Sequence, residues 1–382
     1  MVTPKVSVVM SVYNGMPYLH DAVESILNQT FHDFEFIIID DGSTDGTSQL
    51  LVDYASRDHR VVIIENDENI GYSRSLNKGF ARACGSYIAR QDADDISLPD
   101  RFEKQLAYFD RHPDVGLLGT RPIFIDENDE IIQDSKYIFV SQPEDIPRRL
   151  MDNNCIHHGS IMVRKEIIDQ VGFYKVELEP SEDYDLWLRI SEISKIANLE
   201  EGLYKYREHK QSISSKKRTI QMRNKAIALE SAVIRRYGPH ASETEFKNAS
   251  RDYFRAAIIG FISFSKEDAR DSLEKCLTLY PKFLEQRDLV YDIIRKYTLD
   301  KDPNEAITLI QEIFSSLLPE KASLSKVYAR LLSDKYIDFF FQEINSPDTK
   351  QTRQSLMKGI RLNPRWLLNR GIISYLLKHS LR

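Results

Sequence analysis

The stretch VSVVMSVYNGMPYLHDAVESILNQTFHDFEFIIIDDGSTDGT, residues 6–47, decides the fold. It opens with a continuous apolar, β-branched run over residues 6–12, which is typical of a strand buried on both faces of a parallel sheet. Residues 17–29 then carry apolar side chains at helical spacing, and residues 34–40 repeat the buried-strand pattern. A strand, a helix and a second strand in this order predict a parallel βαβ unit.

The same alternation continues C-terminal to this stretch. The sequence predicts a helix over residues 43–55, a third strand over 60–66, a helix over 73–84 and a fourth strand over 85–90. This βαβαβαβ order predicts a doubly wound, mostly parallel sheet, that is, a Rossmann-like α/β fold. Ligands of such sheets bind at the carboxyl ends of the strands.

The rest of the chain shows two other patterns. Residues 120–215 are irregular, apart from a helix expected over EDYDLWLRI, residues 182–190. The later pattern is entirely helical. We therefore expect an α/β domain over residues 1–215, a helical linker over 216–240 and an all-α domain over 241–382.

The helical region contains a weak internal repeat. The segments ARDSLEKCLTLYPKFL (269–284) and TRQSLMKGIRLNPRWL (352–367) align without gaps, and AITLIQEIFSSLLPE (306–320) has the same shape of a helix followed by proline. This spacing is compatible with stacked helical hairpins of the tetratricopeptide or HEAT kind. An ordinary helical bundle is the alternative.

The composition excludes several classes of protein. The 382 residues carry a net charge of −6, so there is no overall basic field for nucleic acid. The three cysteines are far apart and form no disulfide framework, which indicates a reducing, cytoplasmic compartment. The first apolar run is too short for a secretory signal, and no apolar run approaches the roughly 18 residues that a membrane span needs.

The charge is unevenly distributed. Residues 350–382 contain eight Lys or Arg and no Asp or Glu, which leaves −14 on the remainder because −6 minus 8 is −14. The same segment carries apolar residues from Trp366 to Leu377. Such a segment fits peripheral contact with an anionic membrane, at the inner face in a cytoplasmic protein. The alternative is a terminal helix packed on its own repeat.

A second short stretch, RQDADDISLP at residues 90–99, points to chemistry. Asp92 and Asp94 follow the fourth strand, and residues two apart in extended chain point to the same side. Two such carboxylates suit Mg²⁺ or Mn²⁺, which takes its other ligands from phosphate and water. The alternative is a solvated acidic turn in which Asp95 or Ser97 caps the helix that begins near residue 99.

The acidic pair after the second strand, Asp40 and Asp41, allows other interpretations that fail. An EF-hand loop beginning at Asp41 would need a bidentate Glu where Val52 stands. An aspartyl-phosphate phosphatase requires a different order of acids after the strand. A Rossmann dinucleotide site requires a GxGxxG motif, which is absent after the first strand.

Four ordered motifs together resemble family 2 glycosyltransferases of the GT-A fold. They are the opening stretch, SLNKGFARACGSYIARQDADDISLPDRFEKQL (75–106), SEDYDLWLRI (181–190) and YREHKQSIS (206–214). The resemblance covers about residues 4–215 and implies a nucleotide-sugar site.

The resemblance implies roles for the residues that bind the donor. Ser11 and Tyr13 would line the nucleotide pocket, and Asp41 would accept a hydrogen bond from the base while Asp40 supports the turn or caps a helix. Asp92 would bind the ribose side. Arg74 and Arg90 would face the diphosphate or sugar, or each would be a structural ion-pair partner. Asp94 and His209 would hold the Mn²⁺ or Mg²⁺ ion and, with Arg207, stabilise the leaving diphosphate.

The resemblance also implies the residues that act on the acceptor. Asp183 matches the general base that removes the acceptor hydroxyl proton, and Glu182 and Asp185 stand beside it. These acids could equally form an acidic first helical turn favoured by the helix dipole. His157 and His158 match a segment that borders the acceptor.

The expected protein is thus an inverting, metal-dependent glycosyltransferase. It would move a sugar from a nucleotide-diphosphate sugar to a hydroxyl of a glycan or lipid-linked glycan, in polysaccharide or glycoconjugate biosynthesis. A metal-dependent sugar nucleotidyltransferase and a non-catalytic, glycosyltransferase-like scaffold are the two alternatives.

Overall fold

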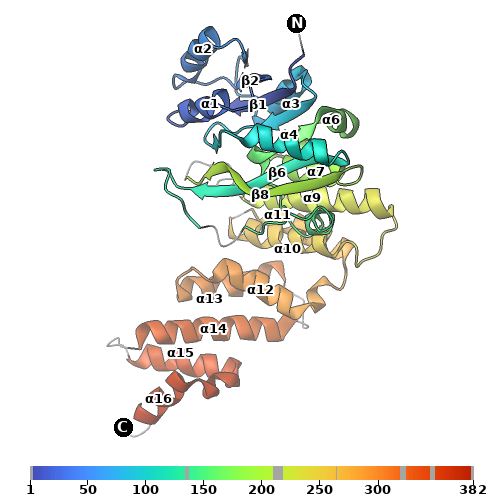
Figure 1. Cartoon of the computed structure of the whole chain (residues 1–382). Helices are drawn as coiled ribbons and strands as arrows, with labels where there is room; N and C mark the ends of the chain where they lie inside the picture. Colours follow the sequence, from blue (N-terminus) through green and yellow to red (C-terminus); the bar gives the residue numbers. More distant parts are fainter. Residues whose placement is uncertain are drawn as a thin grey trace. The chain divides into compact units, whose positions relative to one another are not determined.

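The computed structural model describes residues 3–133, 137–209, 218–263, 265–318, 324–344 and 349–379 (Figure 1). The chain divides into two compact units, Met1–Ala241 and Ser242–Arg382. The predicted positions Lys210–Ser214 of the last motif and Pro319 of the repeat lie outside the described residues.

One sheet forms the centre of the first unit. Within the described residues it has eight strands in the order β3-β2-β1-β4-β7-β6-β8-β5. The strands are β1 (Val6–Val12), β2 (Phe34–Asp40), β3 (Val61–Glu65), β4 (Tyr87–Arg90), β5 (Ile96–Ser97), β6 (Val115–Ile125), β7 (Met162–Arg164) and β8 (Lys195–Arg207). Strands β3, β2, β1 and β4 are parallel to one another, whereas β7 is antiparallel to both β4 and β6. The predicted mostly parallel α/β fold is therefore confirmed.

The helices of this unit complete the alternation that the sequence predicts. They are α1 (Leu19–Leu27), α2 (Thr47–Arg57), α3 (Tyr72–Arg82), α4 (Arg101–Arg111), α5 (Ile146–Leu150), α6 (Lys165–Val171), α7 (Glu182–Ile190) and α9 (Arg218–Tyr237), with short 3₁₀ turns η1 (His158–Ser160) and η2 (Val176–Leu178). The strands predicted at 6–12 and 34–40 match β1 and β2 residue for residue. The predicted helix 182–190 matches α7.

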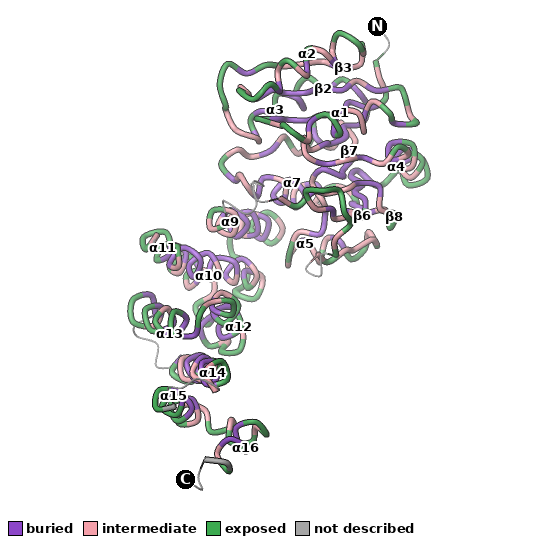
Figure 2. Tube along the Cα trace, turned by 90° about the vertical axis from the view of Figure 1, so that its left-hand side faces the viewer, coloured by how far each residue is buried: buried purple, intermediate pink, exposed green. Residues whose placement is uncertain are grey.

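The apolar patterns of β1 and α1 explain the core. Every residue of β1 is buried, and α1 turns Leu19, Val23 and Ile26 toward the same core. Figure 2 shows the neighbouring strand β2 mostly in the buried colour. A sheet covered on both faces in this way fixes the backbone at its strand ends, where the acidic clusters begin.

The irregular region contains the long pair β6 and β8. These strands run parallel through ten paired positions, with register shifts near Thr120 and Arg121. Strand β5, which directly follows the turn at residues 92–95, pairs with the end of β8. The end of β8 therefore lies next to this turn. Sequence periodicity did not predict these strands.

The second unit is entirely helical where it is described, as predicted. It contains α10 (Lys247–Ile262), α11 (Lys266–Leu279), η3 (Phe283–Glu285), α12 (Arg287–Thr298), α13 (Pro303–Glu312), the π-helical η4 (Ile313–Leu317), α14 (Ser325–Glu343), α15 (Thr349–Leu362), η6 (Pro364–Leu368) and α16 (Arg370–His379). Helix α10 packs on α11, and α14 packs on α15. Both aligned repeat segments form a helix followed by a 3₁₀ turn, α11 with η3 and α15 with η6.

Helices α14, α15 and α16 pack around a small hydrophobic core of their own. Ile372 and Tyr375 of α16 are buried against Phe340 of α14 and Leu356 of α15. Over the described part of the chain, no helix has both the length and the apolar character needed to cross a membrane.

Candidate functional site

Two loops at the carboxyl ends of β1 and β2 are held together by side chains. The amide of Asn14 donates to Ser43 Oγ at 2.9 Å, and Asn14 Oδ1 accepts from the amide of Thr44 at 2.8 Å. The amide of Gly15 donates to Thr47 Oγ1 at 2.9 Å. Asn14 has a φ of 52°, a left-handed conformation that asparagine tolerates better than most residues. The two loops therefore form one interlocked rim.

Two of the predicted nucleotide-binding residues lie at this rim. The Tyr13 side chain follows β1 and is 50% exposed, so its ring is free to meet a planar base. Ser11 lies two residues earlier and is buried. Their roles in binding stay predictions.

Asp40 and Asp41 are almost fully buried, and both organise loops. Asp40 accepts hydrogen bonds from the amide of Ser43 and from Ser48 Oγ, as expected for a residue that supports the turn. Asp41 accepts from Asn66 Nδ2 at 2.8 Å and from the amides of Ile70 and Gly71 at 2.9 and 3.0 Å. Asp41 thus ties the β3–α3 loop to the rim, and both of its oxygens already have protein donors.

The acidic stretch after β4 is a turn and not the extended chain that the sequence predicted, because the amide of Asp95 points back to the carbonyl of Asp92. Asp92 Oδ1 accepts from Tyr72 Oη and from Arg90 Nη2, each at 2.6 Å. Burial raises the pKa of Asp92, but the Arg90 guanidinium, the nearby histidines and the hydrogen bond from Tyr72 together outweigh it, so the net pKa lies below its usual value. The carboxylate is therefore held ionised at a fixed place.

Arg90 is a structural ion-pair partner and does not face solvent. Its side chain is fully buried, and Nη1 donates to the carbonyls of Val9 and Gln91. Its Nε–H points at His158 Nε2 at 3.5 Å, and the same His158 nitrogen lies 2.7 Å from Tyr174 Oη. Arg74, in contrast, is exposed and donates to the carbonyl of Ile70, so its charge remains available at the surface.

The two histidines of the CIHHG segment have separate surroundings. Burial and the Arg90 cation lower the pKa of His158 to about 3, which suits a neutral ring that accepts from two donors. Burial lowers the pKa of His157 to about 4, and its ring packs against Tyr204 and Tyr206. His158 thus belongs to the network that holds Asp92, and acceptor contact by either ring stays a prediction.

Asp94 and His209, predicted as the metal pair, lie together. His209 Nε2 is 2.9 Å from Asp94 Oδ2, although the residues are 115 positions apart. The Asp94 side chain is 37% exposed, so a ligand can reach it. Arg207 is buried and donates from Nε to the backbone carbonyl of Asp94, so it holds the backbone of the turn and leaves the Asp94 side chain free of this contact.

The prediction that Asp95 caps a helix is wrong. Asp95 is buried, and its Oδ1 accepts from the amide of Arg207 at 2.8 Å, while α4 begins only after Asp100. Burial and the nearby charges of Asp94 and Asp92 raise the pKa of Asp95 well above its usual value. The alternative cap, Ser97, instead donates to Gln91 Oε1. The partner of Asp95 could not be predicted because it comes from β8.

Glycine at position 159 is required by close approach to the acidic turn. A Cβ atom there would lie 2.6 Å from Asp92 Oδ2 and 2.1 Å from Tyr204 Oη. Real Cβ atoms do not approach so closely, so any side chain would displace the Asp92 carboxylate or the tyrosine. Tyr204 also accepts a hydrogen bond from the amide of Asp92 at 3.1 Å.

Asp183 lies in the first turn of α7. Its Oδ1 accepts from the amide of Tyr184 at 2.7 Å, and its Oδ2 accepts from Asn154 Nδ2 at 3.1 Å. Burial raises the pKa of Asp183 to about 6 against the lowering effect of these two donors, and the charge of Asp92 raises it further. The Asp92 and Asp183 carboxylates are therefore near enough for their charges to interact.

The acidic neighbours of Asp183 have other surroundings. Asp185 is fully buried in ion pairs with Arg189 at 2.7 Å and Lys175 at 3.1 Å. Glu182 is also buried, and burial together with the Asp183 charge raises its pKa to about 8. Asp183 is the member of this trio that combines partial exposure with a pKa below 7.

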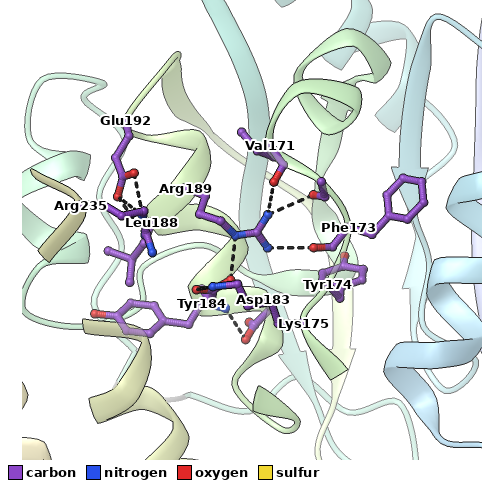
Figure 3. A network of polar contacts seen from close by, with 12 residues as sticks. Val171, Phe173, Tyr174, Lys175, Asp183, Tyr184, Leu188, Arg189, Glu192 and Arg235 are labelled. Carbon is purple, nitrogen blue, oxygen red and sulfur yellow. Dashed lines mark hydrogen bonds and ion pairs between the residues drawn. The ribbon is translucent and has the colours of Figure 1, made fainter. Parts of the chain in front are cut away.

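A polar network anchors α7 (Figure 3). The Arg189 guanidinium donates to the carbonyls of Val171, Gly172 and Phe173, at 2.7, 3.1 and 2.8 Å, and ties the loop after α6 to α7. Arg235 of α9 pairs with Glu192 at 2.8 Å just beyond the same, C-terminal end of α7. The C-terminal end of the helix that carries Asp183 is thus tied both to the loop after α6 and to α9.

The side chains of the site supply some, but not all, of the ligands that a divalent ion needs. Among the described residues, no cluster of three or more His, Cys, Asp or Glu side chains could enclose a metal. Asp94 and His209 place one carboxylate oxygen and one imidazole nitrogen side by side. Mg²⁺ and Mn²⁺ sites that act on phosphates commonly use only one or two protein ligands, so this pair is adequate when diphosphate and water complete the shell.

Sequence reasoning missed several residues that position the site. They are Tyr72 as a donor to Asp92, Asn154 as the donor to Asp183, and Gly159 and Tyr204 against the acidic turn. Their partners are 20 or more positions away in the sequence, so no local spacing indicates them. The glycine that directly follows the His157–His158 pair was the one feature of the sequence that indicated a close backbone approach at this position.

The α/β sheet with carboxylates at its strand ends is the architecture of nucleotide-sugar transferases, and comparison with known proteins agrees. The sequence model described as glycosyl transferase family 2 matches residues 7–172. An uncharacterised glycosyltransferase of Methanocaldococcus jannaschii is 40% identical over 210 residues, which are 53% of this chain and 71% of the relative. The chain belongs to glycosyl transferase family 2 and is a glycosyltransferase.

Another relative is named for its part in O-antigen biosynthesis. The O-antigen biosynthesis glycosyltransferase WbnJ of Escherichia coli is 39% identical over 212 residues, which are 54% of this chain and 81% of WbnJ.

Solved structures share the fold at low sequence identity. Residues 1–349 of S. aureus TarS, in complex with UDP-GlcNAc, superpose with a TM-score of 0.53 at 17% identity, covering 88% of this chain and 92% of that one. The mannosyltransferase PcManGT from Pyrobaculum calidifontis, in complex with GDP-Man and Mn²⁺, gives a TM-score of 0.50 at 14% identity, covering 90% and 88%. These likenesses show the fold.

Proposed function

We propose that this glycosyltransferase moves a sugar from a nucleotide-diphosphate sugar to a hydroxyl group with inversion at the anomeric carbon. One observation carries the proposal: the His158 ring packs between Tyr72, which donates to Asp92, and Trp187 of α7, so the helix of Asp183 lies beside the Asp92–Asp94 turn, and the pKa of Asp183 is raised to about 6. A base that is ionised at neutral pH and placed opposite a diphosphate-binding turn is what a single displacement requires.

The donor would bind across the interlocked rim and the acidic turn. The exposed Tyr13 ring offers a surface for the base, and Ser11 and Asp41 line the same edge. Asp92, oriented by Arg90 and Tyr72, would accept from the ribose, and Arg74 would face the diphosphate. The nucleotide-sugar complexes of TarS and PcManGT support this class of donor.

The proposed transfer step involves one proton transfer, one bond that forms and one bond that breaks. The acceptor hydroxyl oxygen attacks the anomeric carbon as Asp183 takes its proton, while the bond from that carbon to the diphosphate oxygen breaks. The diphosphate leaves with the electron pair. Asn154 and the amide of Tyr184 hold the Asp183 carboxylate, so its free lone pairs can be directed at the acceptor.

Asp94 and His209 would hold a Mn²⁺ or Mg²⁺ ion. When bound, the ion supplies positive charge against the negative charge that develops on the leaving diphosphate. Arg207 contributes by fixing the backbone of the turn from which Asp94 projects.

The acceptor would be a hydroxyl of a glycan or a lipid-linked glycan. The relation to WbnJ supports a role in polysaccharide or glycoconjugate biosynthesis. Three free cysteines, two of them buried, suit a reducing, cytoplasmic compartment.

A panel of nucleotide-sugars incubated with Mn²⁺ tests the proposal. We expect slow hydrolysis of one donor to a nucleoside diphosphate, faster release with a glycan acceptor, and loss of both on chelation. Release of pyrophosphate would instead indicate the sugar nucleotidyltransferase, and inertness toward every donor would indicate the scaffold.

Two substitutions test the assigned residues. Asp94→Ala and Asp183→Asn should each abolish transfer, while their thermal unfolding stays close to that of the native chain. Asp169→Asn is the matched control, since Asp169 is an exposed partner of Lys165 on α6 and lies outside the site. Turnover near the native rate in either site variant would remove that residue from its role.

A further inference from the structure

The end of the second unit exposes apolar side chains that lie among basic ones. In η6, Leu367 and Leu368 are 46% and 81% exposed, and in α16 Ile373 and Leu377 are 39% and 64% exposed. Arg365 and Arg370 flank the two leucines and are exposed as well. We call these six residues the C-terminal tip.

The exposure of the tip is not explained by the packing of its helix. The inward face of α16 is already complete, because Ile372 and Tyr375 are buried against α14 and α15. Ile373 and Leu377 are four residues apart and point away from that core together, with Arg370 on the same face of the helix.

The charge of the segment identifies the partner. Residues 350–382 carry eight Lys or Arg and no Asp or Glu, while the rest of the chain carries −14. Within the described part of the chain, Arg361, Arg365 and Arg370 form no ion pair with an acid. Exposed leucines surrounded by uncompensated cations match a surface that is apolar inside and anionic outside, which is the interface of an acidic lipid bilayer.

A second copy of the chain fits the tip less well. A two-fold symmetric contact would place the same patch of both copies face to face and bring the two basic segments together. Like charges placed opposite one another cost free energy, which works against such a contact.

We propose that the C-terminal tip docks the protein on the surface of anionic membranes, with Leu367 and Leu368 inserted at the level of the lipid headgroups. Ile373 and Leu377 lie against the same interface, and the flanking arginines contact lipid phosphates. The docking is reversible and salt-dependent, because it combines few apolar side chains with screened charge. It goes beyond the proposed transfer reaction, since it needs neither donor nor metal.

Vesicle flotation with the full chain tests the docking. Vesicles of phosphatidylcholine alone are compared with vesicles that also contain phosphatidylglycerol, at low and high salt. We expect the native chain to float with the anionic vesicles only and to dissociate at high salt.

Two pairs of variants separate the apolar and charged contributions. The double substitution Leu367→Ser and Leu368→Ser should weaken binding at least about tenfold. Its control is Leu299→Ser, at a residue that is 50% exposed in the same unit. The double substitution Arg365→Gln and Arg370→Gln should weaken binding about tenfold or more. Its control, Lys282→Gln with Arg287→Gln, removes two exposed cations elsewhere in the unit and should bind like the native chain.

Three outcomes would overturn the docking proposal. They are equal flotation with neutral and anionic vesicles, absence of flotation with both, and unchanged binding of the leucine variant. Self-association that is lost in the leucine variant without lipid would assign the tip to a second copy instead. Donor hydrolysis, measured without vesicles, should be native in every variant, so a failed docking test leaves the transfer proposal intact.

Discussion

At the start of α7, three acidic side chains in four positions have different surroundings. Asp185 is neutralised by Arg189 and Lys175, and Glu182, with a pKa of about 8, holds its proton at neutral pH. Asp183, with a pKa of about 6, is ionised at pH 7 and remains basic enough to accept a proton. Burial of one acid and pairing of another thus leave a single candidate for the base.

The pH dependence of turnover should report the Asp183 pKa. A base must be deprotonated, so kcat/KM should fall as the pH drops through about 6. Asn154→Ala removes a donor that lowers the pKa of Asp183, so the acid limb should move to higher pH. A pH–rate profile of donor consumption measures both effects. Asn153→Ala, at an exposed neighbouring residue, is the control, and an unmoved limb in Asn154→Ala would contradict the assignment.

Gly159→Ala should damage the donor site without unfolding the chain. The new Cβ would meet Asp92 Oδ2 and Tyr204 Oη, and displacing Asp92 by about 1 Å can cost about a hundredfold in kcat/KM. Titration of the nucleoside diphosphate should show weaker binding in parallel. Gly260→Ala is the control, because its Cβ would meet ordinary contacts at 3.5 Å or more inside α10. Native kinetics in Gly159→Ala would show that the turn tolerates displacement.

Local sequence could predict which residue types gather at the site, but not how each is used. Asp94 and His209 come together as the resemblance implied, although 115 positions separate them. Asp95 was assigned to a helix cap because helix-capping rules consider only neighbouring residues, whereas its real partner is the amide of Arg207. Local sequence also did not indicate the burial of Arg90, whose Nη1 donates to the carbonyl of Val9 on the neighbouring strand β1 and to that of the next residue, Gln91.

Helix α9 holds the segment that leads into α7. Asn224 Nδ2 donates to the carbonyl of Glu179 at 2.8 Å, and Ser181 Oγ donates to the carbonyl of Gln221 at 2.9 Å. Glu179 Oε2 accepts from the amide of Ser73 in the first turn of α3. The residues just before Asp183 are therefore held between α3 and α9, and the catalytic unit extends beyond the motifs that define the family.

Asn224→Ala should loosen this segment. Loss of one buried hydrogen bond costs about 1 kcal/mol of stability, and misplacement of Asp183 should lower kcat about tenfold. Asn28→Ala is the control, because the Asn28 amide bonds only within α1, to the carbonyl and carboxylate of Glu24. Steady-state kinetics and thermal unfolding of both variants distinguish the two effects. Equal kcat in both would show that α9 does not position the base.

The parallel half of the sheet was predictable and the other half was not, for a physical reason. Strands β1 to β4 are short, continuous apolar runs separated by helices of regular period, so each can be recognised alone. Strands β6 and β8 pair across about 80 positions, with register shifts. Strand β7 enters antiparallel between β4 and β6. Pairing over such distances depends on tertiary contacts that local periodicity does not encode.

The division of the chain into two compact units predicts that the first unit works alone. A fragment of residues 1–241 contains the sheet, α7 and α9, and it should hydrolyse the donor with a kcat within about twofold of the full chain. The Asp183→Asn form of the fragment gives the background rate. A fragment that aggregates, or that folds and is inert, would show that residues 242–382 are needed for the catalytic unit itself.

The rim formed by Asn14, Ser43 and Thr44 is complete before any ligand arrives. The polar groups of these residues form hydrogen bonds with one another, and Asp41 accepts a hydrogen bond from the next loop, at the amide of Ile70. On the proposed function, a related enzyme could change the irregular half of the sheet while keeping these two loops as they are. The interlocked loops would then form a part of the fold that is conserved in shape while the rest of the domain varies.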